Sequence, residues 1–273
     1  MSELKQLPYL LALIDDESPA TRRAVIKELS SYGKNLEKVL DNLIPPPSEA
    51  VRRKVQELLS HHLSNEKGNH WMNWLNEEDD YIRLEKAVAF LSSFQSEFYD
   101  HDNIKKAIDE LATTFLSTGA ENNIFELSKF LFVTLGYVGE KDSFYDPKNN
   151  DVAYVLKHKK GLPISLAIIY MLVGKSIGLT IEGFNYPGHF MAKSEWNGTS
   201  YLIDCFNHGQ IFKENEFLQA NVSGSIDSNR KLFKANSKII VGRVLRNLAK
   251  AYETSGDNLR SRQVVDFLKE LGS

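Results

Sequence analysis

Apolar side chains recur every three or four positions through most of this chain, which is the spacing of amphipathic helices. The helical spacing covers residues 81–94, 103–118, 127–135, 237–254 and 259–271. Between residues 181 and 204 it gives way to short β-rich runs, which meet at Asn197-Gly198, a dipeptide typical of tight hairpin turns. The pattern therefore predicts a helix-rich α+β protein with a small antiparallel sheet.

The first 65 residues contain an internal repeat. ATRRAVIKELS begins at Ala20 and AVRRKVQELLS begins at Ala50, and six of the paired positions are identical. Each copy follows another apolar-periodic run, at residues 7–14 and 36–44. Helix pairs that repeat at this period bury their apolar faces by stacking on each other. The stretch DDESPATRRAV resembles a HEAT-type repeat, and two ordinary helical hairpins are the alternative interpretation.

The segment GLPISLAIIYMLVGKSIGL, which starts at Gly161, predicts a helix with a hydroxyl side chain in its first turn. Pro163 suits the first helical turn and Gly178 suits the end, so we expect a helix over residues 163–176. Ser165 then lies in the first turn, where unpaired amides and the helix dipole favour a negative charge. A thiol there would have a lowered pKa, whereas a hydroxyl gains much less because its alkoxide stays inaccessible near neutral pH.

A histidine and an aspartate fall on the two strands of the predicted hairpin. The register set by the turn pairs His189 with Phe206. Asp204 is then a diagonal neighbour on the face that carries His189. A carboxylate there can accept the imidazole N–H and leave the other ring nitrogen for a nucleophile. A buried histidine that is satisfied by a purely structural carboxylate is an equally good interpretation.

Three motifs in this region stand in the order found in one known family. They are GLPISL, PGHF and IDCF, which begin at Gly161, Pro187 and Ile203. With the lead-in LFVTLGYVGEKDSFYDPKNNDVAYVL they resemble the transglutaminase-like superfamily, and more narrowly its SirB-type branch, over roughly residues 80–212. The resemblance implies a papain-type core, in which a nucleophile helix packs on an antiparallel sheet.

The resemblance also implies roles for particular residues. It makes His189 the base or acid, Asp204 the residue that orients it, and Ser165 the occupant of the nucleophile position. Active transglutaminases and papain-like peptidases carry a cysteine where this chain has Ser165. Cys205 replaces a proline of the SirB-type pattern. Its side chain is expected on the face opposite to Asp204, so we do not interpret it as a displaced nucleophile.

These patterns divide the chain into three predicted parts. Residues 1–75 form the HEAT-like helical region, and residues 76–235 form the transglutaminase-like core. Residues 236–273 form a helical hairpin that resembles a tetratricopeptide-type pair and that we expect to pack on the core.

Composition limits the partners. The net charge of −3 gives no reason to expect nucleic acid or an anionic membrane surface. Cys205 is the single cysteine, so no intrachain disulfide forms, and an N-terminal apolar run broken by acids is too short for a signal peptide or a membrane span. The histidines lack metal-ligand spacing. We expect a cytoplasmic protein without metal or cofactor, with a protein or peptide as its partner.

Two functions from different classes follow. In the first, the protein is a catalytically silent transglutaminase-like module that binds a protein or peptide in the former active-site cleft. A cysteine and a histidine form an ion pair at rest, whereas serine must give up its proton during attack, so the exchange of cysteine for serine removes activity. In the second, Ser165, His189 and Asp204 form a working triad of a hydrolase or acyltransferase.

Overall fold

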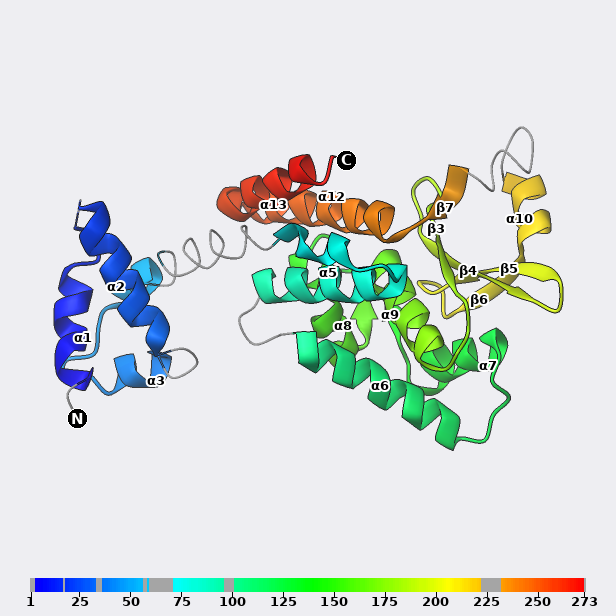
Figure 1. Ribbon diagram of the computed structural model, residues 1–273, viewed down its shortest axis with the longest axis horizontal. Coiled ribbons are helices and arrows are strands. Elements are labelled where there is room, and N and C mark those ends of the chain that lie inside the picture. The colour runs from blue at the N-terminus through cyan, green and yellow to red at the C-terminus, as the bar shows by residue number, and fades with distance from the viewer. Residues whose placement is uncertain are drawn as a thin grey trace. The chain divides into compact units, whose positions relative to one another are not determined.

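The computed structural model describes residues 3–16, 18–32, 36–55, 58, 71–95, 101–221 and 232–272. The chain separates into two compact units, Met1–His70 and Trp71–Ser273 (Figure 1). Only the second unit contains the residues that the sequence singles out for chemistry. The three-part division at residues 75 and 235 stays a prediction.

The described part of the first unit consists of short helices. They are α1 (Glu3–Ala12), α2 (Pro19–Ser31), α3 (Leu36–Asp41) and a helical stretch at 49–55. The hydroxyl oxygens of Ser18 and Ser48 accept the backbone N–H groups of Thr21 and Val51 over 3.4 Å each, so both repeat copies begin with a serine cap. The buried apolar side chains of these helices form one cluster: Leu7, Ile14, Val25, Ile26, Leu29, Leu36, Leu40 and Val55. The kinship of this region to HEAT repeats stays a prediction.

The second unit is built around one buried helix, α9 (Pro163–Ser176), in which every residue from Ile164 to Gly174 is buried. Helices α5 (Asp80–Gln95), α6 (His101–Ser117) and α8 (Val152–His158) pack on it. The remaining helical segments are η2 (Trp71–Asn76), α7 (Ile124–Ser128), η3 (Lys129–Thr134), η4 (Pro147–Asn150), α10 (Glu214–Asn221), α12 (Ser237–Ser255) and α13 (Asn258–Glu270). The start and end of α9 agree with the positions that its proline and glycine predict.

A five-stranded antiparallel sheet in the order β6-β5-β4-β3-β7 completes this unit (Figure 1). Its strands are β3 (Glu182–Phe184), β4 (Met191–Trp196), β5 (Thr199–Asp204), β6 (Gln210–Lys213) and β7 (Lys234–Ala235). Asn197 and Gly198 have φ angles of 49° and 73°, as the predicted hairpin turn requires, and Trp196 pairs with Thr199. A separate parallel pair joins β1 (Val138–Gly139) to β2 (Lys160–Gly161). The predicted helix-rich α+β class with a small antiparallel sheet is confirmed.

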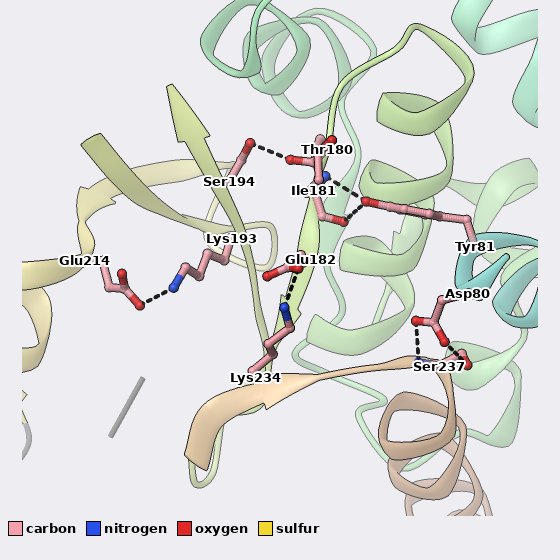
Figure 2. A network of polar contacts seen from close by, with 10 residues as sticks. All are labelled: Asp80, Tyr81, Thr180, Ile181, Glu182, Lys193, Ser194, Glu214, Lys234 and Ser237. Atoms are coloured by element: carbon pink, nitrogen blue, oxygen red, sulfur yellow. Dashed lines mark hydrogen bonds and ion pairs between the residues drawn. The ribbon is translucent and has the colours of Figure 1, made fainter. Parts of the chain in front are cut away.

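The C-terminal hairpin α12–α13 packs on the core through contacts between aromatic rings and through hydrogen bonds. The Trp71 ring lies 5.0 Å from that of Phe267 on α13, and its indole nitrogen donates to the Phe267 carbonyl oxygen over 3.3 Å. Figure 2 shows the start of α12, where the Asp80 carboxylate accepts the backbone N–H and the hydroxyl of Ser237. The same view shows the Tyr81 hydroxyl bonded to both backbone polar groups of Ile181. These contacts join segments that are about 100 to 200 residues apart in the chain.

Candidate functional site

Ser165 lies in the first turn of α9, where the sequence predicts it, but its hydroxyl is used inside the protein. The side chain is fully buried, and its Oγ donates to the carbonyl oxygen of Asn149 over 2.8 Å. The same carbonyl oxygen accepts the backbone N–H of Leu162 over 3.2 Å. The serine therefore ties the start of α9 to the end of η4.

His189 and Asp204 lie in contact, but His189 is in the loop two residues before β4 and not on a strand as the sequence predicts. The imidazole Nε2 lies 2.8 Å from the Asp204 Oδ1, and the two side chains are 25% and 9% exposed. Nε2 is buried, but its geometry relative to the Asp204 carboxylate is not that of a well-aligned hydrogen bond. We therefore describe the two side chains as a pair on the basis of the short Nε2–Oδ1 distance. The backbone N–H of His189 donates to the Tyr186 carbonyl oxygen over 3.0 Å, which fixes the loop that presents the ring. With Nε2 against the carboxylate, Nδ1 is the ring nitrogen left for another partner.

The carboxylate of Asp204 is held by three groups at the end of β5. Oδ1 accepts the backbone N–H groups of Phe206 and Asn207 over 3.2 Å each, and Oδ2 accepts the Asn207 side-chain amide over 2.8 Å. Burial raises the pKa of Asp204, but the close contact with His189 and the hydrogen bonds from Asn207 outweigh burial, so the pKa lies below its ordinary value. Asp204 is therefore a charged and rigidly placed partner for the imidazole.

Two short strands bring the end of β5 next to the start of α9. The N–H of Gly139 on β1 donates to the Phe206 carbonyl oxygen over 3.3 Å, and the N–H of Glu140 donates to the Gly161 carbonyl oxygen over 3.0 Å. A Cβ atom on Gly139 would lie 2.4 Å from the Phe206 ring, so only glycine permits this approach. The region that carries Asp204 and the region that carries Ser165 thus meet through β1.

The geometry does not assemble a serine triad. In the part of the chain that the structure describes, no hydrogen bond joins Ser165 to His189. The Ser165 hydroxyl proton points at a backbone carbonyl oxygen, and a peptide carbonyl does not act as a base. The predicted roles of Ser165, His189 and Asp204 as site residues stay a prediction, while the His189–Asp204 contact itself is observed.

A row of aromatic rings extends away from His189, from the half-buried Phe206 to the exposed Phe144 and Tyr145, and no sequence pattern singled it out. The centre of the Phe206 ring lies 6.3 Å from that of the imidazole. The ring centres of Phe144 and Phe206 are 6.4 Å apart, and those of Tyr145 and Phe144 are 5.4 Å apart. Phe144 and Tyr145 are 38% and 55% exposed. We call Phe144, Tyr145 and Phe206 the aromatic ridge. Its one sequence signal is the pair of adjacent aromatic residues in the loop before Asp146-Pro147.

Cys205 is not positioned for chemistry. Its side chain is fully buried, and its thiol donates to the Ile203 carbonyl oxygen over 3.7 Å. Burial raises its pKa well above the ordinary value, and the neighbouring charge of Asp204 adds to the rise. The thiol is therefore protonated and unreactive at neutral pH.

Two hollows occur on the sheet, lined by residues other than the predicted site residues. One of about 520 Å³ is lined by residues of β4, β5, β6 and α10. The other, of about 460 Å³, is lined by residues of β3, β4 and β5 together with Ile124 and the segment before β3. The first contains the fully buried Glu214, whose Oε1 lies 2.6 Å from the Lys193 ammonium group (Figure 2). This buried ion pair links α10 to the sheet.

The described residues offer neither a metal-binding cluster nor a helix suited to crossing a membrane. Within them, no group of three or more His, Cys, Asp or Glu side chains could hold a metal ion. No helix in the same part of the chain is long and apolar enough to cross a membrane.

Comparison with known proteins identifies the family. Residues 101–246, more than half of the chain, match the profile described as the transglutaminase-like superfamily, and the chain belongs to that superfamily. A UPF0162 protein of Xylella fastidiosa (strain Temecula1) is 26% identical over 215 residues, which cover 74% of this chain and 76% of the relative. A UPF0162 protein of strain 9a5c is 28% identical over 175 residues, which cover 62% of this chain and 60% of the relative.

A shorter match lies in a larger mouse protein. F-box only protein 21 of Mus musculus is 27% identical over 78 residues, which cover 29% of this chain and 12% of that protein. No solved structure matches the chain.

Proposed function

We propose that this protein is a catalytically silent transglutaminase-like module that binds a protein or peptide segment at the surface around His189. The observation that carries the proposal is the contact of Ser165 with Asn149. A nucleophilic serine needs its hydroxyl hydrogen-bonded to a general base, which accepts the proton during attack. The Ser165 hydroxyl is instead fully buried and donates to a backbone carbonyl oxygen over 2.8 Å.

The residue type supports the same proposal. A cysteine at this helix start would be activated by the helix dipole and the imidazole, because a thiolate is accessible near neutral pH. A serine hydroxyl at the same position has no accessible anion. The His189–Asp204 pair then serves to order the loop and the strand end that border the binding surface.

The aromatic ridge supplies the contact area that such a module needs. Phe144 and Tyr145 expose ring surface and connect through Phe206 to His189, whose side chain is 25% exposed. Exposed aromatic side chains are enriched at protein interfaces, where they bury a large area at low entropic cost. We propose that the ridge forms the apolar part of the binding surface.

The finer family assignments belong to the same proposal. Within the superfamily we assign the chain to the SirB-type branch, with Ser165 at the nucleophile position. The first unit then resembles HEAT repeats and the C-terminal hairpin a tetratricopeptide-type pair, flanking a core at residues 76–235. A cytoplasmic location agrees with the single buried cysteine.

Intact-mass labelling with a fluorophosphonate probe tests the absence of an activated serine. The folded wild-type chain and Ser165→Ala are expected to show the same mass spectrum, without an adduct. Stoichiometric labelling of the wild type that disappears in Ser165→Ala would overturn the proposal and establish a serine nucleophile.

One observation favours the alternative, a hydrolase or acyltransferase that uses Ser165. Asp204 lies 2.8 Å from His189 and has a lowered pKa, as an orienting carboxylate in a triad requires. This function needs the Ser165 side chain to leave Asn149 and turn toward Nδ1 of His189. Ser165→Cys separates the two functions, because an activating site makes the new thiol react faster with iodoacetamide than free cysteine does. We expect slower reaction, since the position is buried.

A further inference from the structure

Arg243 on α12 holds the loop that carries His189. Its Nη1 donates to the Asn185 side-chain oxygen and, over 3.0 Å, to the Tyr186 carbonyl oxygen. The Tyr186 carbonyl oxygen also accepts the His189 backbone N–H. The Arg243 guanidinium carbon lies 5.6 Å from the centre of the Phe190 ring. Arg243 therefore contacts the chain on both sides of His189.

No ion pair balances the charge of Arg243 within the part of the chain that the structure describes. Among the residues that the structure describes, neither Arg243 nor Arg246 makes an ion pair, whereas Arg260 on α13 lies 3.7 Å from Asp257. Burial lowers the pKa of Arg243, and the positive charge of Arg246 lowers it further. A partly buried cation without a counter-charge is unfavourable.

The donors of Arg243 are also incompletely used. Both of its hydrogen bonds come from Nη1 and end on neutral oxygens, so Nε and Nη2 have no partner in the described part of the chain. A guanidinium presents its donors as a planar fork that matches a carboxylate. Arg246 is exposed and adds a second positive charge one helical turn away. The two arginines thus offer positive charge and free donors at the edge of the surface around His189.

The same helix borders the aromatic ridge. α12 packs against η4, the segment that follows Tyr145 after one intervening residue. The Lys250 ammonium group on α12 and the Tyr145 side chain are close enough to interact electrostatically. α12 therefore runs from the loop of His189, at Arg243, toward the exposed end of the ridge.

We propose that Arg243 and Arg246 form an anion-recognition site, and that its occupant is an acidic peptide segment. A carboxylate of the segment pairs with the guanidinium groups, and an apolar or aromatic side chain of the segment lies on the ridge. This inference rests on the proposed binding function and names the chemistry of the partner. A short acidic segment fits better than nucleic acid, because the chain's net charge of −3 repels an extended polyanion.

Peptide capture from a synthetic heptapeptide library tests this proposal. The full chain is immobilised and equilibrated with the library, and the retained peptides are sequenced by mass spectrometry. Wild type is expected to retain peptides in which Asp and Glu are enriched about threefold or more over the input. Arg246→Gln is the decisive variant, since Arg246 is exposed and makes no hydrogen bond or ion pair among the described residues. It is expected to reduce the acidic enrichment to the input level.

Arg262→Gln on α13 is the matched control, because it removes the same charge from another exposed position. It should retain the wild-type enrichment. Arg243→Gln should also lose the enrichment, and its thermal unfolding reports any loosening of the loop. A retained peptide should bind Arg246→Gln about three- to tenfold more weakly than wild type in fluorescence anisotropy.

The outcomes separate the two proposals. Retained peptides without acidic enrichment, or enrichment that persists in Arg246→Gln, overturn the anion site and leave the binding module standing. If no peptide is retained above a blank surface, both proposals are wrong.

Discussion

The Ser165 hydroxyl lies 2.8 Å from the carbonyl oxygen of Asn149, and it serves there as a structural tie. The contact joins the first turn of α9 to the end of η4, the two segments that flank α8. A nucleophile at this helix start would instead point its proton at the imidazole of His189. The Ser165 hydroxyl has one proton, so it cannot donate to the Asn149 carbonyl oxygen and to the His189 imidazole at the same time.

Ser165→Ala should lower the free energy of unfolding by about 1 kcal/mol, the typical net value of one intramolecular hydrogen bond. The loss stays small because the Asn149 carbonyl oxygen keeps the N–H of Leu162. Urea denaturation measures it. Ser128→Ala is the matched control, since that buried hydroxyl also donates to a backbone carbonyl oxygen, that of Gly209, over 2.9 Å. A cost several times larger for Ser165→Ala than for Ser128→Ala would contradict a simple structural tie.

The His189–Asp204 pair predicts a particular acid sensitivity. Because the pKa of Asp204 is lower in the folded chain than its ordinary value of 3.8, the unfolded state binds that proton more tightly. The stabilisation by this carboxylate is fully present above that ordinary value and is lost as the pH falls through the lower, folded-state pKa. Urea midpoints between about pH 2 and 6 should therefore fall more steeply for wild type than for Asp204→Asn. Asp266→Asn, at an exposed position, should follow the wild-type slope.

Gly139→Ala should destabilise the protein by about 1–3 kcal/mol, the usual cost of overpacking. The new methyl group would lie 2.4 Å from the Phe206 ring, which has to move. Because Phe206 also contacts His189 and Phe144, peptide retention should fall as well. In the Gly139→Ala/Phe206→Leu double variant part of the lost stability should return, as thermal unfolding measures. If the double variant is no more stable than Gly139→Ala, the Phe206 ring is not what the new methyl group clashes with.

The aromatic ridge should matter for binding and not for folding. Phe144→Ser and Tyr145→Ser should each reduce retention of library peptides by at least about threefold, because exposed aromatic anchors carry much of the energy of an interface. Their unfolding free energies should change by less than about 0.5 kcal/mol. Val133→Ser is the control. It removes an apolar side chain that is 67% exposed and does not belong to the aromatic ridge, so it should leave peptide retention unchanged. Equal losses in all three variants would assign retention to nonspecific apolar contact.

The boundary between the units can be tested by truncation. A fragment of residues 71–273 keeps Trp71 and Trp74, which are 0% and 3% exposed in the second unit. It should unfold cooperatively near the temperature at which the second unit unfolds in the full-length chain. A fragment of residues 77–273 lacks both rings and should lose at least about 3–5 kcal/mol, the typical cost of deleting one buried tryptophan side chain. Calorimetry decides, and similar unfolding of the two fragments would favour the boundary at residue 75.

Much of the site follows from local sequence features. The turn at Asn197-Gly198 sets the register of β4 and β5, which places the start of β4 beside the end of β5 that carries Asp204. His189 itself lies in the loop before β4, and its contact with Asp204 also depends on how that loop is held. The family motifs identified the superfamily correctly. The aromatic ridge escaped prediction because its members lie about 60 residues apart and become neighbours only through β1. β6 and β7 were not predicted as strands, since four-residue and two-residue segments carry little periodicity.

The sequence by itself determined the ends of α9 and the turn and register of the β4–β5 hairpin. Proline, glycine and turn residues act on their immediate neighbours, so their effect does not depend on the rest of the fold. Only the tertiary structure decided where the Ser165 hydroxyl points, because its acceptor lies 16 residues earlier and reaches it through the packing of η4 on α9. Tertiary structure alone also placed Arg243 beside Tyr186, 57 residues away. Such contacts depend on how whole elements pack, and no local pattern contains that information.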